Sequence, residues 1–306
     1  MLRYLLRRLA LTIPVLFGVA TMVFALIHLV PGDPAQAMLG ESAADSDVRD
    51  LRTRLGLDQP LMVQYQSFLG GLARGDLGTS FRYNTPVSKE ILARLGPTTA
   101  LAVVAMVVAI LIAIPLGVIG ALYRGRVVDR AAMTLSLAGI AMPNFWLGPV
   151  LAIIFSVELG WLPVSGSGTW RHLVLPALTL GSALAAVTAR MTRASLGDEL
   201  RELYVLAARA RGLSRARVVL AHAWRNSLIP VVTIVGLQLG AVLTGTIITE
   251  TIFSWPGVGR LLIQAITFRD YPLVQGCILL IAVTYVTMNL VVDMVYALLD
   301  PRIRYQ

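Results

Sequence analysis

The chain has 306 residues, of which 57% are hydrophobic and 14% charged, and its net charge is +9. Soluble domains carry about 25% charged residues, so this composition excludes an ordinary soluble protein and indicates an integral helical membrane protein. The positive charge favours basic loops on the cytoplasmic side over nucleic-acid binding, and the single cysteine, Cys277, excludes an intrachain disulfide or a cysteine metal cluster.

Six apolar stretches are each long enough to cross a hydrocarbon core of about 30 Å. They cover about 9–30, 98–122, 131–157, 173–191, 228–250 and 273–299. The first is interpreted as a retained helix and not as a secretory signal peptide, because its apolar run is longer than usual and is followed by Pro31-Gly32-Asp33-Pro34. The sequence therefore predicts an all-α, multi-pass membrane protein with one transmembrane domain, residues 1–306.

The placement of arginines indicates the orientation in the membrane. With both termini in the cytoplasm, most of the 26 basic residues fall on the inner side. This choice makes about 31–97 an external insertion after the first span, about 192–227 a cytoplasmic loop and about 251–272 an external loop. We expect a bacterial plasma (inner) membrane location.

The 192–227 loop is predicted to contain a short helix over 200–212. Asp198 and Glu199 are expected to open it, because acidic residues favour a helix N-terminus. Gly212 is expected to end it. An amphipathic helix on anionic head groups and a helix that docks on another protein both remain open, although the small residues favour docking. The predicted docking residues are Leu203, Tyr204, Ala207, Ala208, Arg209, Arg211 and Gly212.

Ala207-Ala208, three further residues and Gly212, followed by a helix that runs to Pro230, resemble the cytoplasmic loop of permease subunits in binding-protein-dependent ABC importers. The resemblance implies a coupling helix that fits a cleft on an ATPase subunit. The family pattern begins with glutamate where this chain has Leu206, so Arg209 or Arg211 would supply the polar contact.

Further segments resemble the first permease subunit of dipeptide and oligopeptide importers over nearly the whole chain. These segments are 3–9, 13–18, 28–34, 75–80, 225–230 and 250–257. The resemblance implies the type I ABC importer permease fold, a second permease subunit, two ATP-binding subunits or one fused pair, and an external solute-binding protein. Related systems move nickel chelates or glutathione, so the resemblance leaves a peptide substrate as the first expectation and these as alternatives.

The sequence contains no G-x-x-x-x-G-K-[ST] phosphate-binding loop. We therefore expect no catalysis and no cofactor in this chain, with ATP and magnesium bound by the partner subunits. An ion-gradient-driven transporter would need mid-span carboxylates or inverted repeats, and only Asp293 approaches that requirement. A membrane enzyme would need a paired nucleophile and base, and no span contains such a pair.

Polar residues at depth in a membrane protein tend to face a cavity or another helix. Candidates for the pathway or a gate are Asn144, Gln238, Glu250 and Asn289. For the three amides, hydrogen bonding between helices is the alternative, and Glu250 could instead hold the loop that follows it. Candidates for docking the binding protein are Asp76, Trp255 and Arg260. No histidine spacing suggests a metal site.

Overall fold

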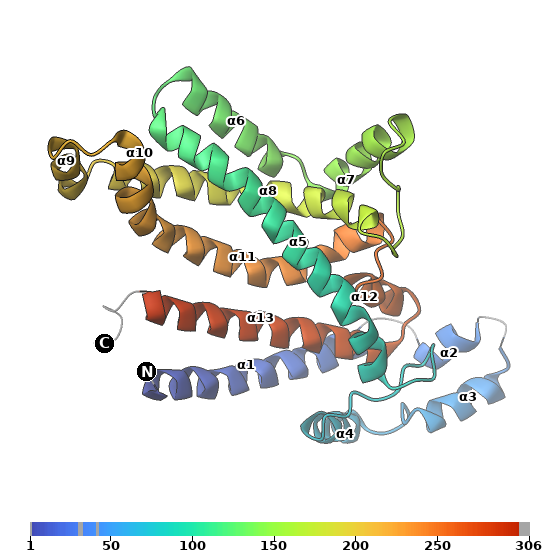
Figure 1. The fold of residues 1–306 in the computed structure, drawn as a ribbon. Helices are drawn as coiled ribbons and strands as arrows, with labels where there is room; N and C mark the ends of the chain where they lie inside the picture. The colour runs from blue at the N-terminus through green and yellow to red at the C-terminus, as the bar shows by residue number, and fades with distance from the viewer. Residues whose placement is uncertain (1, 30–32, 41–42, 300–306) are drawn as a thin grey trace. The chain divides into compact units, whose positions relative to one another are not determined.

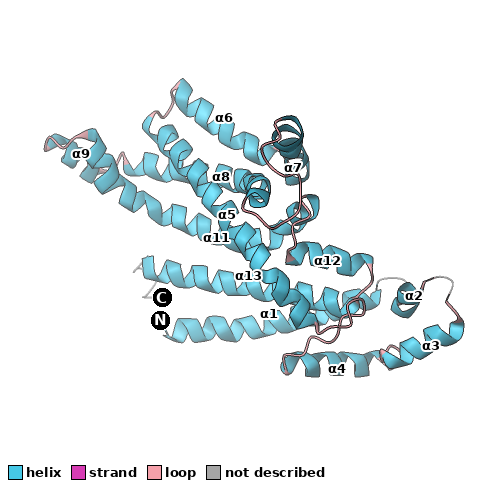
Figure 2. Ribbon diagram, turned by 45° about the vertical axis from the view of Figure 1, so that its right-hand side comes forward, coloured by secondary structure: helices cyan, strands magenta, loops and turns pink. Residues whose placement is uncertain are grey.

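The computed structural model describes residues 2–29, 33–40 and 43–299, and within these ranges the regular structure is helical apart from one isolated β-bridge between Thr79 and Pro86 (Figure 1, Figure 2). The chain divides into two compact units. The first comprises 1–98 with 256–286, and the second comprises 99–255 with 287–306.

The first unit is built around α1 and the short helices that follow it. Its helices are α1 (Leu2–Leu29), α2 (Pro34–Leu39), α3 (Asp45–Arg54), α4 (Leu61–Ala73), the start of α5 (Val87–Leu122), α12 (Val258–Thr267) and the first part of α13 (Tyr271–Leu299). The ring of Phe24 on α1 lies 5.2 Å from that of Tyr65 and 5.7 Å from that of Phe68, so aromatic contacts join α1 to α4.

The second unit holds the longest helices. It contains the rest of α5, α6 (Val127–Ala141), α7 (Asn144–Ala152), the π-helix η1 (Ile153–Glu158), α8 (Arg171–Glu199), α9 (Leu203–Ala210), α10 (Arg215–Arg217), the π-helix η2 (Val218–Ala223), α11 (Trp224–Ile252) and the end of α13. A Cβ atom on Gly139 would lie 2.4 Å from the carbonyl oxygen of Ser182, and one on Gly117 2.5 Å from Thr192 Cβ. Missing side chains on α6 and α5 therefore let both helices approach α8 closely.

Four helical segments of the described residues are long and apolar enough to cross a membrane: Val87–Leu122, Arg171–Glu199, Arg215–Gly240 and Tyr271–Val292. A fifth span is present if the pair Val127–Gly139 and Asn144–Glu158, bent by 96°, counts as one. In α1 the apolar segment Leu11–Ala25 is shorter. The six predicted stretches fall on helices in the described residues, and the stretch 131–157 is interrupted by a break between α6 and α7.

The break in that stretch has a local cause. Met142 takes the extended conformation (φ −96°, ψ 112°), as expected of a residue that precedes proline, and Pro143 then caps α7. Pro149, Pro176 and Pro230 lie inside helices that continue past them.

Candidate functional site

The short helix α9 is held on the second unit by one buried edge. Val205 and Ala208 pack into an apolar cluster with Leu196 at the end of α8 and Val218 in η2. Figure 1 shows α9 beyond the end of α8 and beside the start of α11. Residues three apart on a helix share a face, so this edge fixes the direction in which the rest of α9 points.

The opposite side of α9 presents apolar side chains to its surroundings. Leu203 is 80% exposed and Leu206 50% exposed, and Arg209 and Arg211 are also exposed. Exposed leucines in a polar setting are typical of an interaction surface. The exposed apolar face therefore runs through Leu203 and Leu206, and the predicted docking residue Ala208 is instead part of the buried edge.

The end of α9 follows the prediction for Gly212. Its φ is +83°, its amide donates to the carbonyl oxygen of Arg209 at 2.9 Å, and no atom lies within 4 Å of the position that a Cβ would take. A left-handed conformation with open space around it is a glycine helix terminus.

The start of α9 differs from the prediction. Asp198 and Glu199 do not open this helix, because α8 continues through Glu199, and α9 begins at Leu203 after Glu202. The two acidic side chains have partners instead: Arg124 lies 3.4 Å from the carboxylate of Asp198, and the Tyr204 hydroxyl donates to Glu199. Partial burial, then the hydrogen bond to Glu199, raise the pKa of Tyr204 above its ordinary value.

The same hydroxyl of Tyr204 accepts a hydrogen bond from Asn226 Nδ2 at 3.1 Å, which links α9 to the beginning of α11. Arg215 donates to the carbonyl oxygen of Leu122 at 3.2 Å and so ties the following turn to the end of α5. The end of α5, the end of α8 and the start of α11 thus lie beside α9 and the turn that follows it.

The four polar candidates for a pathway lie at separate places. Gln238 on α11 bonds to α8, since its Oε1 accepts from Thr188 Oγ1 at 2.9 Å and its Nε2 donates to the Leu184 carbonyl oxygen at 3.2 Å. This is the helix-to-helix bonding that the sequence offered as the alternative. Asn144 is at the α6–α7 break, and Asn289 is half-buried on α13. Asp293 has a side chain outside the described residues.

Glu250 is fully buried in the last turn of α11, about 18 Å along the axis from Gln238. Its carbonyl oxygen accepts from the amide of Trp255 at 2.8 Å, and the indole packs against Leu101 and Leu180. In the same corner, Gly166 donates to the Phe253 carbonyl oxygen at 2.9 Å. Trp255 is therefore a core residue of the second unit and does not present its ring at a surface.

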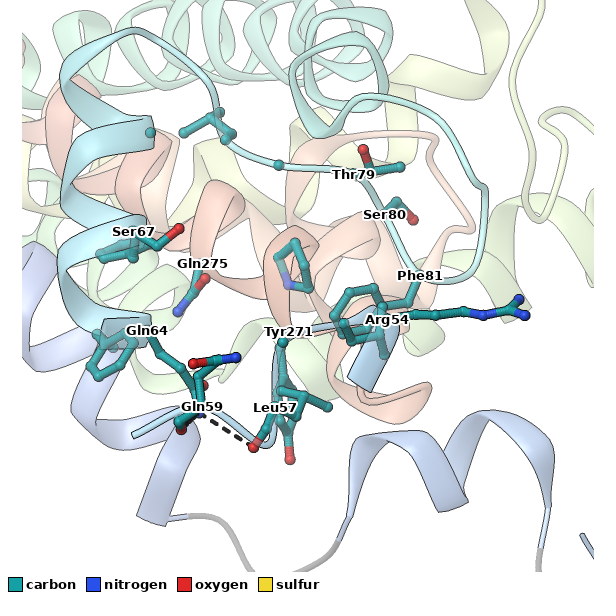
Figure 3. Close-up of a pocket in the computed structure, with 18 of the residues that line it drawn as sticks. Arg54, Leu57, Gln59, Gln64, Ser67, Thr79, Ser80, Phe81, Tyr271 and Gln275 are labelled. Carbon is teal, nitrogen blue, oxygen red and sulfur yellow. Dashed lines mark hydrogen bonds between the residues drawn. The ribbon is translucent and has the colours of Figure 1, made fainter. Parts of the chain in front are cut away.

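The first unit contains a cavity of about 590 Å³ between α1, the 51–84 segment and the start of α13 (Figure 3). Ser67 on α4 and Tyr271 and Gln275 on α13 line it, together with Asp76. The Asp76 carboxylate accepts from the Gly78 amide at 2.8 Å, which shapes the turn at the cavity wall. Arg260, the other candidate in this unit, is on α12 and half-buried.

Sequence reasoning missed Asp270, which fastens the wall of this cavity. Its buried carboxylate accepts from the Ser80 hydroxyl at 2.5 Å and from the amides of Phe81 at 3.1 Å and Arg82 at 3.2 Å. The guanidinium of Arg82 also lies 3.2 Å from the centre of the Phe268 ring. The partners are about 190 residues apart in sequence, so no local pattern signals the contact.

Comparison with known proteins identifies this arrangement. Residues 113–305 match the family described as binding-protein-dependent transport system inner membrane component, and residues 1–102 match the N-terminal part of such membrane components. The chain belongs to this family. It is a transmembrane permease subunit of an ATP-driven importer and not itself a catalyst, which decides against the ion-driven transporter and the membrane enzyme.

Relatives of the family match over the full length. The glutathione transport system permease protein GsiC of Escherichia coli (strain K12) and that of Salmonella typhi are each 47% identical over 306 residues, which is 100% of both chains. A solved structure of the MetNI methionine ABC transporter, in inward-facing conformations, superposes with a TM-score of 0.58 at 18% identity, over 69% of this chain and 96% of that chain. An amino acid ABC transporter gives a TM-score of 0.51 at 15% identity, over 70% of this chain and 94% of that chain.

The solved structures share the type I importer permease fold with this chain. Together with the apolar helices, membership of an inner-membrane family makes the chain a multi-pass membrane protein. The predicted fold class and importer function are thereby confirmed.

Proposed function

We propose that this permease passes short peptides of the size of glutathione or a dipeptide. The support is the 47% identity, over full length, with permeases named for glutathione transport, together with the sequence resemblance to peptide importers. A nickel chelate is the remaining alternative. We further propose that both termini lie in the cytoplasm, because that orientation puts the arginine-rich 192–227 loop on the inner side.

In this proposal the chain forms half of the pathway and works with a second permease, two ATP-binding subunits and an external solute-binding protein. ATP and magnesium are bound by the ATP-binding subunits, and this chain holds no cofactor. The observation that carries the coupling role is the geometry of α9: Val205 and Ala208 anchor it, while Leu203 and Leu206 remain exposed. A helix fastened along one edge can transmit a push from a partner that covers the other.

The polar cavity of the first unit and the exposed Asp76 beside it belong, in this proposal, to the surface that receives the binding protein, with Arg260 on α12. Trp255 is packed in the core of the second unit and is not assigned to that surface. In the pathway, Gln238 and Asn289 are half-buried and Asn144 stands at a helix break. We propose Asn144 and Asn289 as lining residues and Gln238 and Glu250 as residues that hold the helices around them.

The test is ATP-driven uptake into liposomes that contain both permeases and the ATP-binding subunits, with the binding protein outside. Labelled glutathione, a dipeptide and a nickel chelate are compared as substrates. Uptake of a peptide that depends on ATP and on the binding protein supports the proposal. Uptake of the chelate alone would refute the peptide assignment, and uptake driven by an ion gradient without ATP would refute the coupling role.

A further inference from the structure

A second cavity, of about 340 Å³, opens between α6 and α8 within the second unit. Most of its lining is ionisable, which is unusual between two membrane helices. The lining residues are Asp129, Arg130, Met133, Arg190 and Arg193.

The charges in this cavity do not cancel. Asp129 is only 2% exposed and accepts from Arg193 Nε at 2.5 Å and Nη2 at 2.6 Å, so these two residues neutralise each other. The Gly125 amide adds a third hydrogen bond to Asp129 at 2.8 Å. Arg130 and Arg190 are exposed, and neither forms an ion pair in the part of the chain that the structure describes. Two guanidinium groups thus line the cavity without an ion-pair partner among the described residues, since the Asp129 carboxylate is paired with Arg193.

One end of the cavity is charged and the other continues into apolar surface. Arg130, Met133 and Leu137 follow one face of α6, because residues three and four apart on a helix are neighbours. Leu137 is exposed, and Val187 lies one turn before Arg190 on α8. Beyond them, the contact of Gly139 with Ser182 closes the gap between the helices. An anionic group near the arginines would therefore leave an attached apolar chain along α6.

Arg130 and Arg190 also lie close enough to the ends of their helices to reach lipid head groups. Arg130 is in the first turn of α6, and Arg190 is nine residues, or about 14 Å, before the end of α8. A long arginine side chain at that depth reaches the membrane surface while its stem stays on apolar surface. We expect both guanidinium groups to reach the level of the phospholipid phosphates.

We propose that this cavity binds the phosphate of an anionic phospholipid head group through Arg130 and Arg190, with the Asp129–Arg193 pair as its fixed wall. Guanidinium groups present paired donors that match phosphate oxygens, and basic pockets between membrane helices bind anionic head groups. The general enrichment of basic residues on the cytoplasmic side of membrane proteins would explain the presence of Arg130 and Arg190. It does not account for the hollow between α6 and α8 or for the buried carboxylate that holds Arg193 in place.

The experiment measures lipid binding to the purified importer complex by native mass spectrometry, with phosphatidylglycerol and phosphatidylcholine as probes. The cavity variant is Arg130→Gln with Arg190→Gln. The matched control is Arg126→Gln with Arg217→Gln, two exposed arginines that do not line the cavity. We expect the cavity variant to weaken phosphatidylglycerol binding at least tenfold, the control to leave it unchanged, and phosphatidylcholine to bind weakly throughout.

Equal loss in the control, or unchanged binding in the cavity variant, overturns the proposal. Displacement of the lipid by glycerol 3-phosphate at the same affinity would show a site for soluble phosphate instead. A photoactivatable phosphatidylglycerol on the unmodified complex provides a second measurement, independent of variant folding. Cross-links to α6 or α8 around the cavity support the proposal, whereas cross-links confined to other parts of the complex would overturn it.

Discussion

Replacing Leu203 with alanine distinguishes the contribution of α9 to binding the ATP-binding subunits from its contribution to the stability of the fold. Each buried methylene contributes about 0.8 kcal/mol, so the three carbons removed are worth about 2 kcal/mol where a partner covers them. Leu203 is 80% exposed in this chain, and the same change therefore costs the chain itself about 0.5 kcal/mol. We expect affinity for the ATP-binding subunits to fall about 30-fold, with little change in thermal unfolding.

Val205→Ala is the contrasting variant. Val205 is 0% exposed and packs in the cluster beneath α9, so its truncation loses two buried carbons and leaves a cavity, at a cost of about 2–3 kcal/mol to the fold. Affinity is measured by titrating the ATP-binding subunits onto the purified permease pair, and stability by thermal unfolding. Leu135→Ala, an exposed leucine on α6, is the control for loss of apolar surface. Equal behaviour of Leu203→Ala and Leu135→Ala would refute the docking role of α9.

Three further variants test other parts of the chain. Gly212→Val places a β-branched residue at φ +83°, a strain of about 1–2 kcal/mol; we expect weaker ATPase binding with normal membrane insertion, and Gly212→Asn to keep more activity. Arg209→Glu reverses an exposed charge on α9 and is expected to reduce uptake more than insertion, while equal loss of both would indicate a topological role. Asp270→Asn replaces a carboxylate that accepts from four backbone and side-chain donors with an amide that also donates. We expect a loss of about 2–3 kcal/mol, seen as faster hydrogen exchange at Phe81 and Arg82. Unchanged exchange there would contradict the role of Asp270 in holding this segment.

The helices were predictable from the sequence because their signal is local. In a membrane, a long apolar segment can form its backbone hydrogen bonds in few ways other than a helix. Gly212 ends α9 because glycine tolerates a positive φ. The boundary at Asp198 and Glu199 was not predictable from the preference of acids for helix starts. At the end of α8, Asp198 pairs with Arg124 and Glu199 accepts a hydrogen bond from Tyr204. These are tertiary contacts, which a local sequence preference does not reveal.

Prolines show the same limit in the spans. Pro143 forces Met142 out of the helical conformation, whereas α8 continues past Pro176 and α11 past Pro230. Each proline in the sequence is a position where a helix can break, and contacts with neighbouring helices determine whether the helix continues. The polar site of the first unit lies further beyond sequence reasoning, because Asp270 reaches Ser80 only after folding.

The missing side chains at Gly117 and Gly139 have a mechanical consequence. Backbones in direct contact leave no compliant layer of side chains between α8 and its neighbours, so α5 beyond residue 99, α6 and α8 behave as one stiff plate. In the proposed coupling, a displacement of α9 would therefore move α6 and α8 together. Alanine at Gly139 would put a methyl group 2.4 Å from the Ser182 carbonyl oxygen and force the two helices apart.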